Sequence, residues 1–469
     1  MRIGFGAPSQ GSPAAGVDTL VSFLTADTWL AGAADGSESE RIATRWTWNA
    51  SGTTLRLFLR PNVFFHDDTP LTPALAAESL RSSVSSRAAL SLADVSSVAV
   101  SGPDSIDVRL SRPNAFLLQD LIGVAVTKPG KAPSTAGPFV VVSRHQGDIK
   151  LRAYPRYYRG RPLLNEIDLQ TYPTQRSAWA ALMRGNVDML YEVSREAAEF
   201  VKDQSTVHLC SFARPYYIAL VFNVRHPVLK NPAIRKALNE ALDREALVHD
   251  GMNNWGRPAD GPIPPDHWAY SPATPFVFNP DAAKAAFDEA GFPLKGGSAN
   301  DVPKRFKFTC LVYTGDSRFE HLAILVQKQL ADVGVDMELL PVKDATQLEA
   351  RLGKGDFDAF LFEMVARPIS WTYAFWHSQK NGPLGSGYKA ADAALDRLRG
   401  ARSDDEVRAA VAELTRVLHD DPPAAFLVWQ MNLRAVSDRF DVMPEKGRDI
   451  YSNVWQWHLT SEDSQAAPR

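Results

Sequence analysis

Well-capped helices recur along this chain between short apolar runs, and this alternation restricts the chain to an α/β fold. Asn231 offers a capping side chain before Pro232, and proline suits the first position of a helix. Asn279 is followed by a proline in the same way. A capping box, Ser317 to Glu320, is expected to open a further helix. Apolar runs of strand length lie between these helices, which predicts helices packed on a sheet.

Two of the apolar runs, 216–222 and 424–429, lie where the chain could pass from one structural unit to another. At 469 residues the chain is too long for one compact core, so two or three units are expected. The proline-rich segment 256–280 is either a linker or a loop of fixed shape that lines something. The sequence therefore predicts several α/β units joined at a few points.

Net charge and hydropathy argue against several classes of partner. The formal net charge is −3, so no overall positive field favours nucleic acid or an anionic membrane. No run approaches the ~18 apolar residues that a membrane span requires. The first residues, MRIGFGAPSQG, include no apolar stretch of the kind found in a signal peptide. The chain as given is thus expected to be soluble and to carry no export signal.

The chain has two cysteines, and each stands in a strand-like run. Cys210 and Cys310 are expected to be small buried hydrophobic residues. A disulfide between them is the alternative in an oxidising compartment, because their separation along the chain says nothing about their distance in space. The pairing stays open at this point.

No catalytic signature is present, which favours a binding protein over an enzyme. The patterns GxSxG, HExxH and the P-loop are absent, and no nucleophile–base or acid–base pairing is visible. The ten histidines never occur four residues apart, so no local metal site and no cofactor are expected. The segment Phe65 to Asp68 is expected to form a turn after a strand and not a site.

The segment 357–371, FDAFLFEMVARPISW, combines the features of a binding site. Its apolar half is typical of a buried strand, and the strand stops at an acid and a base, Glu363 and Arg367. Four large rings follow, at Trp371, Tyr373, Phe375 and Trp376. Ligand sites are mostly apolar and contain a few placed polar groups, so this segment is a candidate wall of such a site. The alternative is an ordinary junction between a strand and a loop.

At the level of whole segments, the chain resembles a known family. Three long segments carry the resemblance: RIATRWTWNASGTTLRLFLRPNVFFHDDTPLTPALAAESLR, YYRGRPLLNEIDLQTYPTQRSAWAALMRGNVDML and RPYYIALVFNVRHPVLKNPAIRKALNEALDREAL. They are similar, in this order, to segments of family 5 solute-binding proteins, the peptide, oligopeptide and nickel type that serves ABC importers. Three further segments follow in the expected order: GRPADGPIPPDHWAY, FNPDAAKAAFDEAGF and HLAILVQKQLADVGVDMELL. The likeness covers nearly the whole chain.

The resemblance implies a two-lobed periplasmic-binding-protein fold of class II with a hinged cleft between its α/β lobes. Lobe 1 is expected to comprise residues 1–258 and 434–469, with an extra subdomain inserted at about 36–135. Lobe 2 is expected to comprise residues 259–433. In such a fold, ligand contacts in both lobes shift the population toward the closed form.

The resemblance also suggests how the segment after the apolar strand differs from its relatives. Peptide-binding members have a Trp-x-Ala-Asp-Tyr-like motif there, whose aspartate pairs with the α-amino group of the peptide. Here Glu363 stands at the tryptophan position, and the aspartate position falls at Ala366 or Arg367. Either Glu363 takes over the anchoring role, or Arg367 shifts the preference toward a carboxylate or phosphate. A third reading makes Arg367 a rim residue that faces water.

Further pocket residues are implied by the resemblance. Asn223 matches an asparagine near the cleft, and Thr25 and Asp27 follow a helix that borders the cleft in relatives. The expected ligand-binding residues are Thr25, Asp27, Phe222, Asn223, Glu363, Val365, Arg367, Trp371, Tyr373 and Trp376. For each aromatic ring, packing in the interior of a lobe is the alternative.

These observations lead to a functional hypothesis, an extracytoplasmic receptor that captures a peptide-like solute and delivers it to an ABC permease. One alternative is a receptor for an anionic or glycosylated solute, and another is a sensor that kept the fold without transport. The protein is expected to be a monomer without nucleic-acid partners. Relatives are periplasmic or membrane-anchored, so we expect that an N-terminal leader precedes the given chain.

Overall fold

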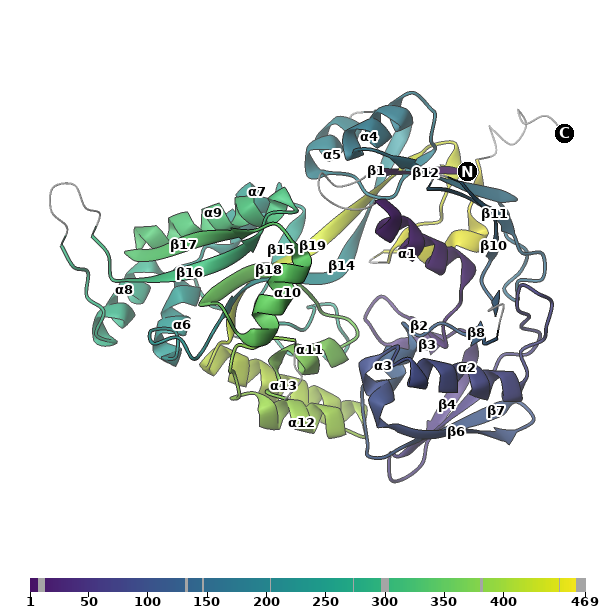
Figure 1. Ribbon diagram of the computed structural model, residues 1–469, viewed down its shortest axis with the longest axis horizontal. Helices are drawn as coiled ribbons and strands as arrows, with labels where there is room; N and C mark the ends of the chain where they lie inside the picture. Colours follow the sequence, from purple (N-terminus) through teal and green to yellow (C-terminus); the bar gives the residue numbers. More distant parts are fainter. Residues whose placement is uncertain are drawn as a thin grey trace. The chain divides into compact units, whose positions relative to one another are not determined.

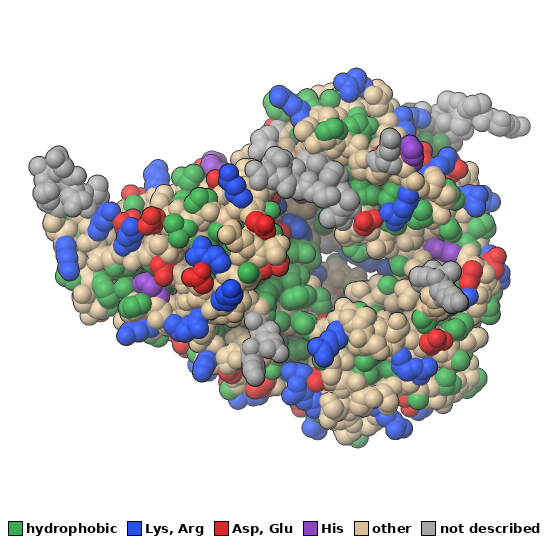
Figure 2. All heavy atoms as spheres, viewed as in Figure 1, with side chains coloured by type: hydrophobic (Ala, Val, Ile, Leu, Met, Phe, Trp, Pro, Cys, Tyr) green, Lys and Arg blue, Asp and Glu red, His purple; other side chains and the backbone are tan. Residues whose placement is uncertain are grey.

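The computed structural model of this chain alternates between strands and helices along its length (Figure 1), which confirms the predicted α/β class. The described residues are 1–6, 13–130, 134–145, 147–202, 204–272, 274–296, 303–379, 383–446 and 448–460. Figure 2 shows acidic and basic side chains interspersed over the face in view, without a broad patch of one sign, as expected from a net charge of −3.

The chain divides into two compact units and crosses between them within two long strands. Unit 1 comprises Met1–Ala213 and Met431–Arg469, and unit 2 comprises Arg214–Gln430. The first crossing lies within β14 (Val207–Phe222) and the second within β19 (Ala424–Ser437). The apolar runs 216–222 and 424–429 are parts of these two strands, beside the breaks between the units.

The first boundary differs from the one expected at residue 258, because residues 214–258 belong to unit 2. Helices α6 (Pro232–Glu240) and α7 (Arg244–Met252) explain the difference: they pack against helices α8 (Pro280–Glu289) and α9 (Ser317–Asp332), respectively, of the same unit. An apolar core common to these four helices therefore holds the segment in unit 2.

Unit 1 contains one large sheet with helices on both faces. Its strand order is β10-β11-β12-β1-β13-β19, in which β1 runs parallel to β12 and β13. Ile3 and Phe5 of β1 share a core with helix α1, whereas Gly6 faces helix α4, where a Cβ would lie only 2.3 Å from Cα of Gln175. Glycine is thus required where β1 meets α4. The elements are β1 (Arg2–Gly6), α1 (Pro13–Thr25), β10 (Phe139–His145), β11 (Asp148–Ala153), β12 (Glu166–Tyr172), α4 (Gln175–Met183), β13 (Met189–Leu190) and α5 (Arg195–Lys202).

A second sheet of unit 1 has its own apolar core, formed by residues between Trp29 and Ala136. It is antiparallel, with strand order β4-β5-β7-β6. This core lies largely within the segment, about 36–135, that the family resemblance suggested as an inserted subdomain. Its elements are β2 (Leu30–Gly32), β3 (Glu38–Glu40), β4 (Ala43–Trp48), β5 (Thr54–Leu59), α2 (Pro73–Ser85), η1 (Leu90–Asp94), β6 (Val95–Gly102), β7 (Ser105–Leu110), α3 (Leu117–Leu121), β8 (Thr127–Lys128) and β9 (Ser134–Thr135). The last elements of unit 1 among the described residues are β20 (Phe440–Asp441), η2 (Ile450–Gln456) and β21 (His458–Leu459).

Unit 2 is built on strands β14, β18, β16 and β17, in that order. The strand β18 runs antiparallel to β14 and parallel to β16, so it lies in the middle of the sheet. Its residues Ala359 and Leu361 are fully buried. The elements not yet given are β15 (Gly256–Pro258), β16 (Phe306–Tyr313), β17 (Val335–Val342), α10 (Ala345–Lys354), β18 (Ala359–Val365), α11 (Ser370–Trp376), α12 (Asp392–Gly400) and α13 (Asp404–Asp420).

The predicted helix starts are mostly confirmed. The side chains of Asn231 and Asn279 each accept a backbone N–H, from Ala233 and Ala282 respectively, before a proline at the start of the helix. The expected capping box at 317–320 was wrong by one residue: Asp316 caps α9 by accepting the N–H of Arg318, and Ser317 is the first helical residue. Aspartate caps a helix as well as serine does, so the helix can begin one residue earlier, with Asp316 as the cap in place of Ser317.

Both cysteines are buried and unpaired, Cys210 in unit 1 and Cys310 in unit 2, which confirms their expected role as core residues. The segment Phe65 to Asp68 forms a turn, as predicted, in which Asp68 N–H donates to the carbonyl of Phe65 at 2.9 Å. Among the described residues, no helix combines the length and apolar character that crossing a membrane requires.

Candidate functional site

Glu363 of β18 is hydrogen-bonded to both strands that connect the units. Arg214 of β14 donates to the carboxylate through Nη1 at 2.8 Å and Nη2 at 3.3 Å. Gln430 of β19 donates through Nε2 at 2.9 Å, and its own Oε1 accepts from Arg318 at 3.1 Å. The guanidinium of Arg214 also lies 4.1 Å from the ring of Tyr216. The carboxylate of Glu363 thus has three donors inside unit 2, and its side chain is 17% exposed.

Arg367, just beyond the end of β18, is held by the proline-rich segment 256–280. Its Nη2 donates to Oδ1 of Asp266 at 3.0 Å, and the side chain of Arg367 is 26% exposed. Ile263 and His267, on either side of Asp266, are buried. These contacts favour the interpretation of 256–280 as a loop of fixed shape rather than a linker.

Three of the predicted aromatic residues lie in α11, and two of these three belong to the interior of unit 2. Trp376 is 1% exposed, and its Nε1 donates to the hydroxyl of Tyr217 at 3.2 Å. Tyr373 donates to Asp396 at 3.0 Å, and burial raises the pKa of its hydroxyl. Trp371 differs, because it is half-buried and stacks on Phe375 with the ring centroids 5.4 Å apart. Trp371 is therefore the ring of the three with the most surface for a ligand.

Phe222 and Asn223 lie at the opposite end of β18 from the other predicted residues of unit 2. Phe222 is fully buried and pairs with Ala359, the first residue of β18. The amide of Asn223 donates to the carbonyl of Phe357 at 2.7 Å, and its Oδ1 accepts the N–H of Arg225 at 3.1 Å. A strand of this length separates its two ends by about 20 Å. The structure thus does not bring Asn223 together with the group from Glu363 to Trp376.

A shallow cavity of about 430 Å³ adjoins Asn223. Its lining residues are Asn223, Arg225, His226, Pro227, Thr309, Arg351, Gly355, Asp356, Phe357 and Asp358. Several of these side chains bond one another, as in the pair of Arg351 and Asp356 at 3.1 Å. Because the lining side chains bond to one another, this cavity is typical of a structural loop and not of a solute site.

Thr25 and Asp27 lie in unit 1, where both make structural contacts. Thr25 ends α1, and its hydroxyl donates to the carbonyl of Val21 at 2.8 Å. Asp27 is fully buried, with Oδ1 2.6 Å from Nε of Arg41 and Oδ2 2.9 Å from the hydroxyl of Tyr157. Burial first and the Asp27 charge second raise the pKa of Tyr157 well above its usual range. Asp27 is therefore the anionic centre of a buried ion pair.

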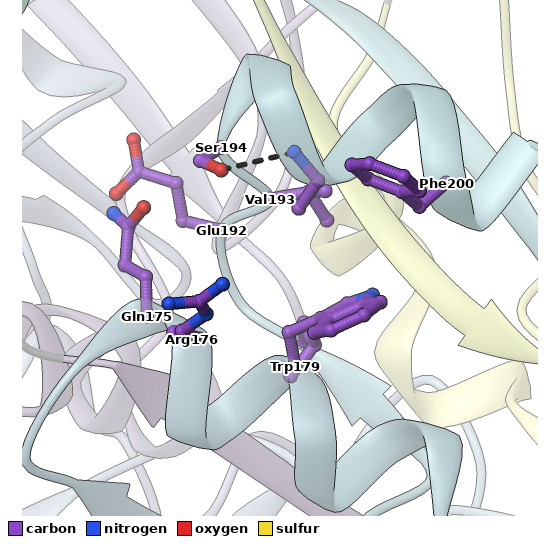
Figure 3. A pocket seen from close by; sticks show the side chains of 9 residues that line it. Gln175, Arg176, Trp179, Glu192, Val193, Ser194 and Phe200 are labelled. Carbon is purple, nitrogen blue, oxygen red and sulfur yellow. Dashed lines mark hydrogen bonds between the residues drawn. The ribbon is translucent and has the colours of Figure 1, made fainter.

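A pocket of about 370 Å³ that no sequence pattern predicted lies in unit 1, between α4, α5 and the loop that joins β13 to α5 (Figure 3). Its lining residues are Gln175, Arg176, Trp179, Leu190, Glu192, Val193, Ser194, Ala197 and Phe200. The hydroxyl of Ser194 accepts the N–H of Ala197 at 3.2 Å, which places the first turn of α5. The only sequence signal was Trp179, a large ring on a short helix of mostly small and polar residues.

No group of three or more histidine, cysteine, aspartate or glutamate side chains suited to a metal ion exists within the described ranges. The described part of unit 2 instead offers ion pairs and aromatic surface along β18 and α11. These groups can bind a solute by hydrogen bonding and stacking.

Comparison with known proteins shows which proteins share this architecture. A sequence model of "Bacterial extracellular solute-binding proteins, family 5 Middle" matches residues 39–384. The oligopeptide-binding protein AppA of Bacillus subtilis is 27% identical over 343 residues, which cover 70% of this chain and 62% of AppA. The nickel-binding periplasmic protein of Escherichia coli is 25% identical over 377 residues, which cover 74% of this chain and 71% of that protein.

Solved structures agree with the fold. The structure of NikA from Brucella suis in complex with Fe(III)-EDTA has a TM-score of 0.84 at 17% identity, covering 98% of this chain and 100% of NikA. That of AppA from B. subtilis in complex with a nonapeptide has a TM-score of 0.76 at 21% identity, covering 98% of this chain and 99% of AppA. At these identities the likeness concerns the fold.

Proposed function

The chain belongs to family 5 of the bacterial extracellular solute-binding proteins, a family without enzymatic activity, and on this basis we propose that it is a receptor that captures a peptide-like solute and delivers it to an ABC permease. The family match from 39 to 384 includes residues of both units and carries this proposal. The sequence match covers 62% of the AppA sequence, less than two thirds of it, so the solute and the permease are both part of the proposal.

The two crossings support a receptor that closes on its solute. Two units joined by two continuous strands, β14 and β19, form the kind of connection about which hinged domains turn. A solute that contacts both units would shift the population toward a closed form. A solute that contacts one unit only would shift nothing.

For the solute, we propose peptide chemistry recognised at the end of β18. Glu363 offers a carboxylate to an α-amino group, Arg367 a guanidinium to a carboxylate, and Trp371 a partly exposed ring to a side chain. Each charged group already has a protein partner, Arg214 or Asp266, which a solute terminus would have to share or replace. The name of AppA as an oligopeptide-binding protein supports this choice of solute.

One observation favours the second candidate, an anionic solute. The aspartate that the family resemblance led us to expect near position 366 is replaced by Ala366 and Arg367, and the Arg367 side chain is 26% exposed. A partly exposed guanidinium binds carboxylates and phosphates well. We propose in either case an extracytoplasmic location, periplasmic or membrane-anchored, which the name of the E. coli nickel-binding periplasmic protein supports.

Native mass spectrometry of the protein purified from cells tests the proposal. We expect co-purified masses that fragment as short peptides, and a protein that stays free of any ligand across growth media would contradict the receptor function. Small phosphorylated or carboxylated compounds in place of peptides would favour the anionic candidate.

A matched pair of variants then tests the anchor. Glu363→Gln should weaken peptide binding about tenfold, because a charge-assisted hydrogen bond to the α-amino group is lost. Glu338→Gln is the control, since Glu338 lies on β17 of the same unit and pairs with Lys307 at 2.6 Å. If the two variants bound the peptide with equal affinity, Glu363 would not be a solute contact, although the proposed receptor function would still be possible.

A further inference from the structure

The pocket between α4 and α5 is formed entirely within unit 1. Its volume of about 370 Å³ lies at the small end of the range for ligand pockets, so it suits one small molecule better than a folded partner. None of its lining residues belongs to the group around Glu363 and Arg367, which lies in unit 2.

One side of this pocket is aromatic and partly open to solvent. The rings of Trp179 and Phe200 lie with their centroids 6.2 Å apart, and the Phe200 side chain is 64% exposed. Leu190 and Val193 are buried beside them. Exposed aromatic surface beside buried apolar side chains is the kind of wall that the apolar body of a small ligand covers.

The other side of the pocket carries one positive and one negative charge. Arg176 comes from the first turn of α4, and Glu192 comes from the loop after β13. Both side chains are exposed, and neither forms an ion pair with another described residue. Figure 3 shows both of them, with the amide of Gln175, on the opposite side of the view from Trp179 and Phe200. The pocket therefore presents a cation and an anion at one end and rings at the other.

We propose that this pocket binds a free α-amino acid with a bulky apolar side chain. The α-carboxylate pairs with Arg176, and the α-ammonium group pairs with Glu192. The side chain of the ligand fills the space beside Trp179 and Phe200. A zwitterion uses both charges at once, whereas a simple carboxylic acid or amine leaves one of them without a partner. This charge complementarity is the reason for choosing an amino acid over other small apolar molecules.

Isothermal titration calorimetry of the intact protein with L-phenylalanine tests the proposal. We expect binding at a concentration of about 1 mM or below. N-acetyl-L-phenylalanine lacks the ammonium group and 2-phenylethylamine lacks the carboxylate, so each should bind at least about tenfold more weakly. No detectable binding of L-phenylalanine at about 10 mM would overturn the proposal, and so would equal binding of all three compounds.

Variants place the binding in the pocket. Arg176→Gln and Glu192→Gln should each weaken L-phenylalanine binding about tenfold. The controls are Arg184→Gln at the end of α4 and Glu199→Gln on α5, which do not line the pocket and should bind as the unchanged protein does. Since all four side chains are exposed, the variants are expected to fold, and their thermal unfolding confirms it. Binding that survives both pocket substitutions and is lost in Glu363→Gln would show that the amino acid binds in unit 2 and would overturn the assignment.

Discussion

The buried ion pair between Asp27 and Arg41 gives the sharpest test of the structure. Asp27→Asn keeps the shape of the side chain but removes its charge, so the guanidinium of Arg41 loses its counter-ion. Breaking a buried pair by removing one partner costs about 3–5 kcal/mol. The Arg41 side chain is 18% exposed, so water screens part of the loss, and we expect about 3 kcal/mol. In a unit of this size, that loss lowers the Tm of unit 1 by about 6–12 °C.

Differential scanning calorimetry is the appropriate assay, because two units can unfold in separate transitions. The transition of unit 1 should move, and that of unit 2 should not. Asp107→Asn is the matched control, since Asp107 also pairs with an arginine in unit 1, Arg56, but that arginine is 45% exposed. The control should cost less than about 1 kcal/mol. Arg41→Met in the Asp27→Asn background should recover part of the loss, because no uncompensated charge is then left buried.

A fall in the Tm of Asp27→Asn no larger than that of the control would refute the reasoning. If Asp27 were a solute contact and not a structural anion, the substitution would lower solute affinity and leave the Tm unchanged.

Three further outcomes are expected. Burial lowers the pKa of His66 from its ordinary 6.5, so near pH 6 the unfolded chain binds a proton that the folded chain does not. The stability of unit 1 should therefore fall as the pH is lowered from about 7 to about 5, and thermal unfolding of His66→Gln should show a weaker dependence on pH. Burial raises the pKa of Cys210 to about 11 and raises that of Cys310 further, so iodoacetamide at about pH 8 should modify neither thiol until urea is added. The mass of the intact protein measures this labelling, and rapid labelling of the native protein would contradict the burial. Trp376→Phe leaves the Tyr217 hydroxyl without its buried donor and should destabilise unit 2 by about 1–3 kcal/mol in urea unfolding, whereas Trp371→Phe at the half-buried ring should cost less.

The features that the sequence predicted correctly depend on short-range interactions. The capping asparagines Asn231 and Asn279 act on residues two or three positions away, so their partners are visible in the sequence. The turn at 65–68 is equally local. The cap of α9 was misplaced because Asp316 and Ser317 are both good capping residues, and local spacing does not choose between them.

The roles of the candidate site residues depend on partners that are distant along the chain. Asp27 meets Tyr157 across 130 residues, and Glu363 meets Arg214 across 149. A carboxylate reserved for a solute and one that is neutralised by an arginine look the same in sequence, because only the fold brings the arginine near. The pocket at Trp179 was missed for the same reason, since its walls come from two helices and a loop whose packing no local pattern specifies.

The position of Glu363 has a mechanical consequence. Arg214 is the first residue of unit 2 and Gln430 is its last, and the side chains of both donate hydrogen bonds to the carboxylate of Glu363. If either β14 or β19 changed direction inside unit 2, its hydrogen bond to Glu363 would be broken. If the units turn about these two strands, as the proposed function requires, we expect the strands to bend near Ala213 and Met431, outside these hydrogen bonds.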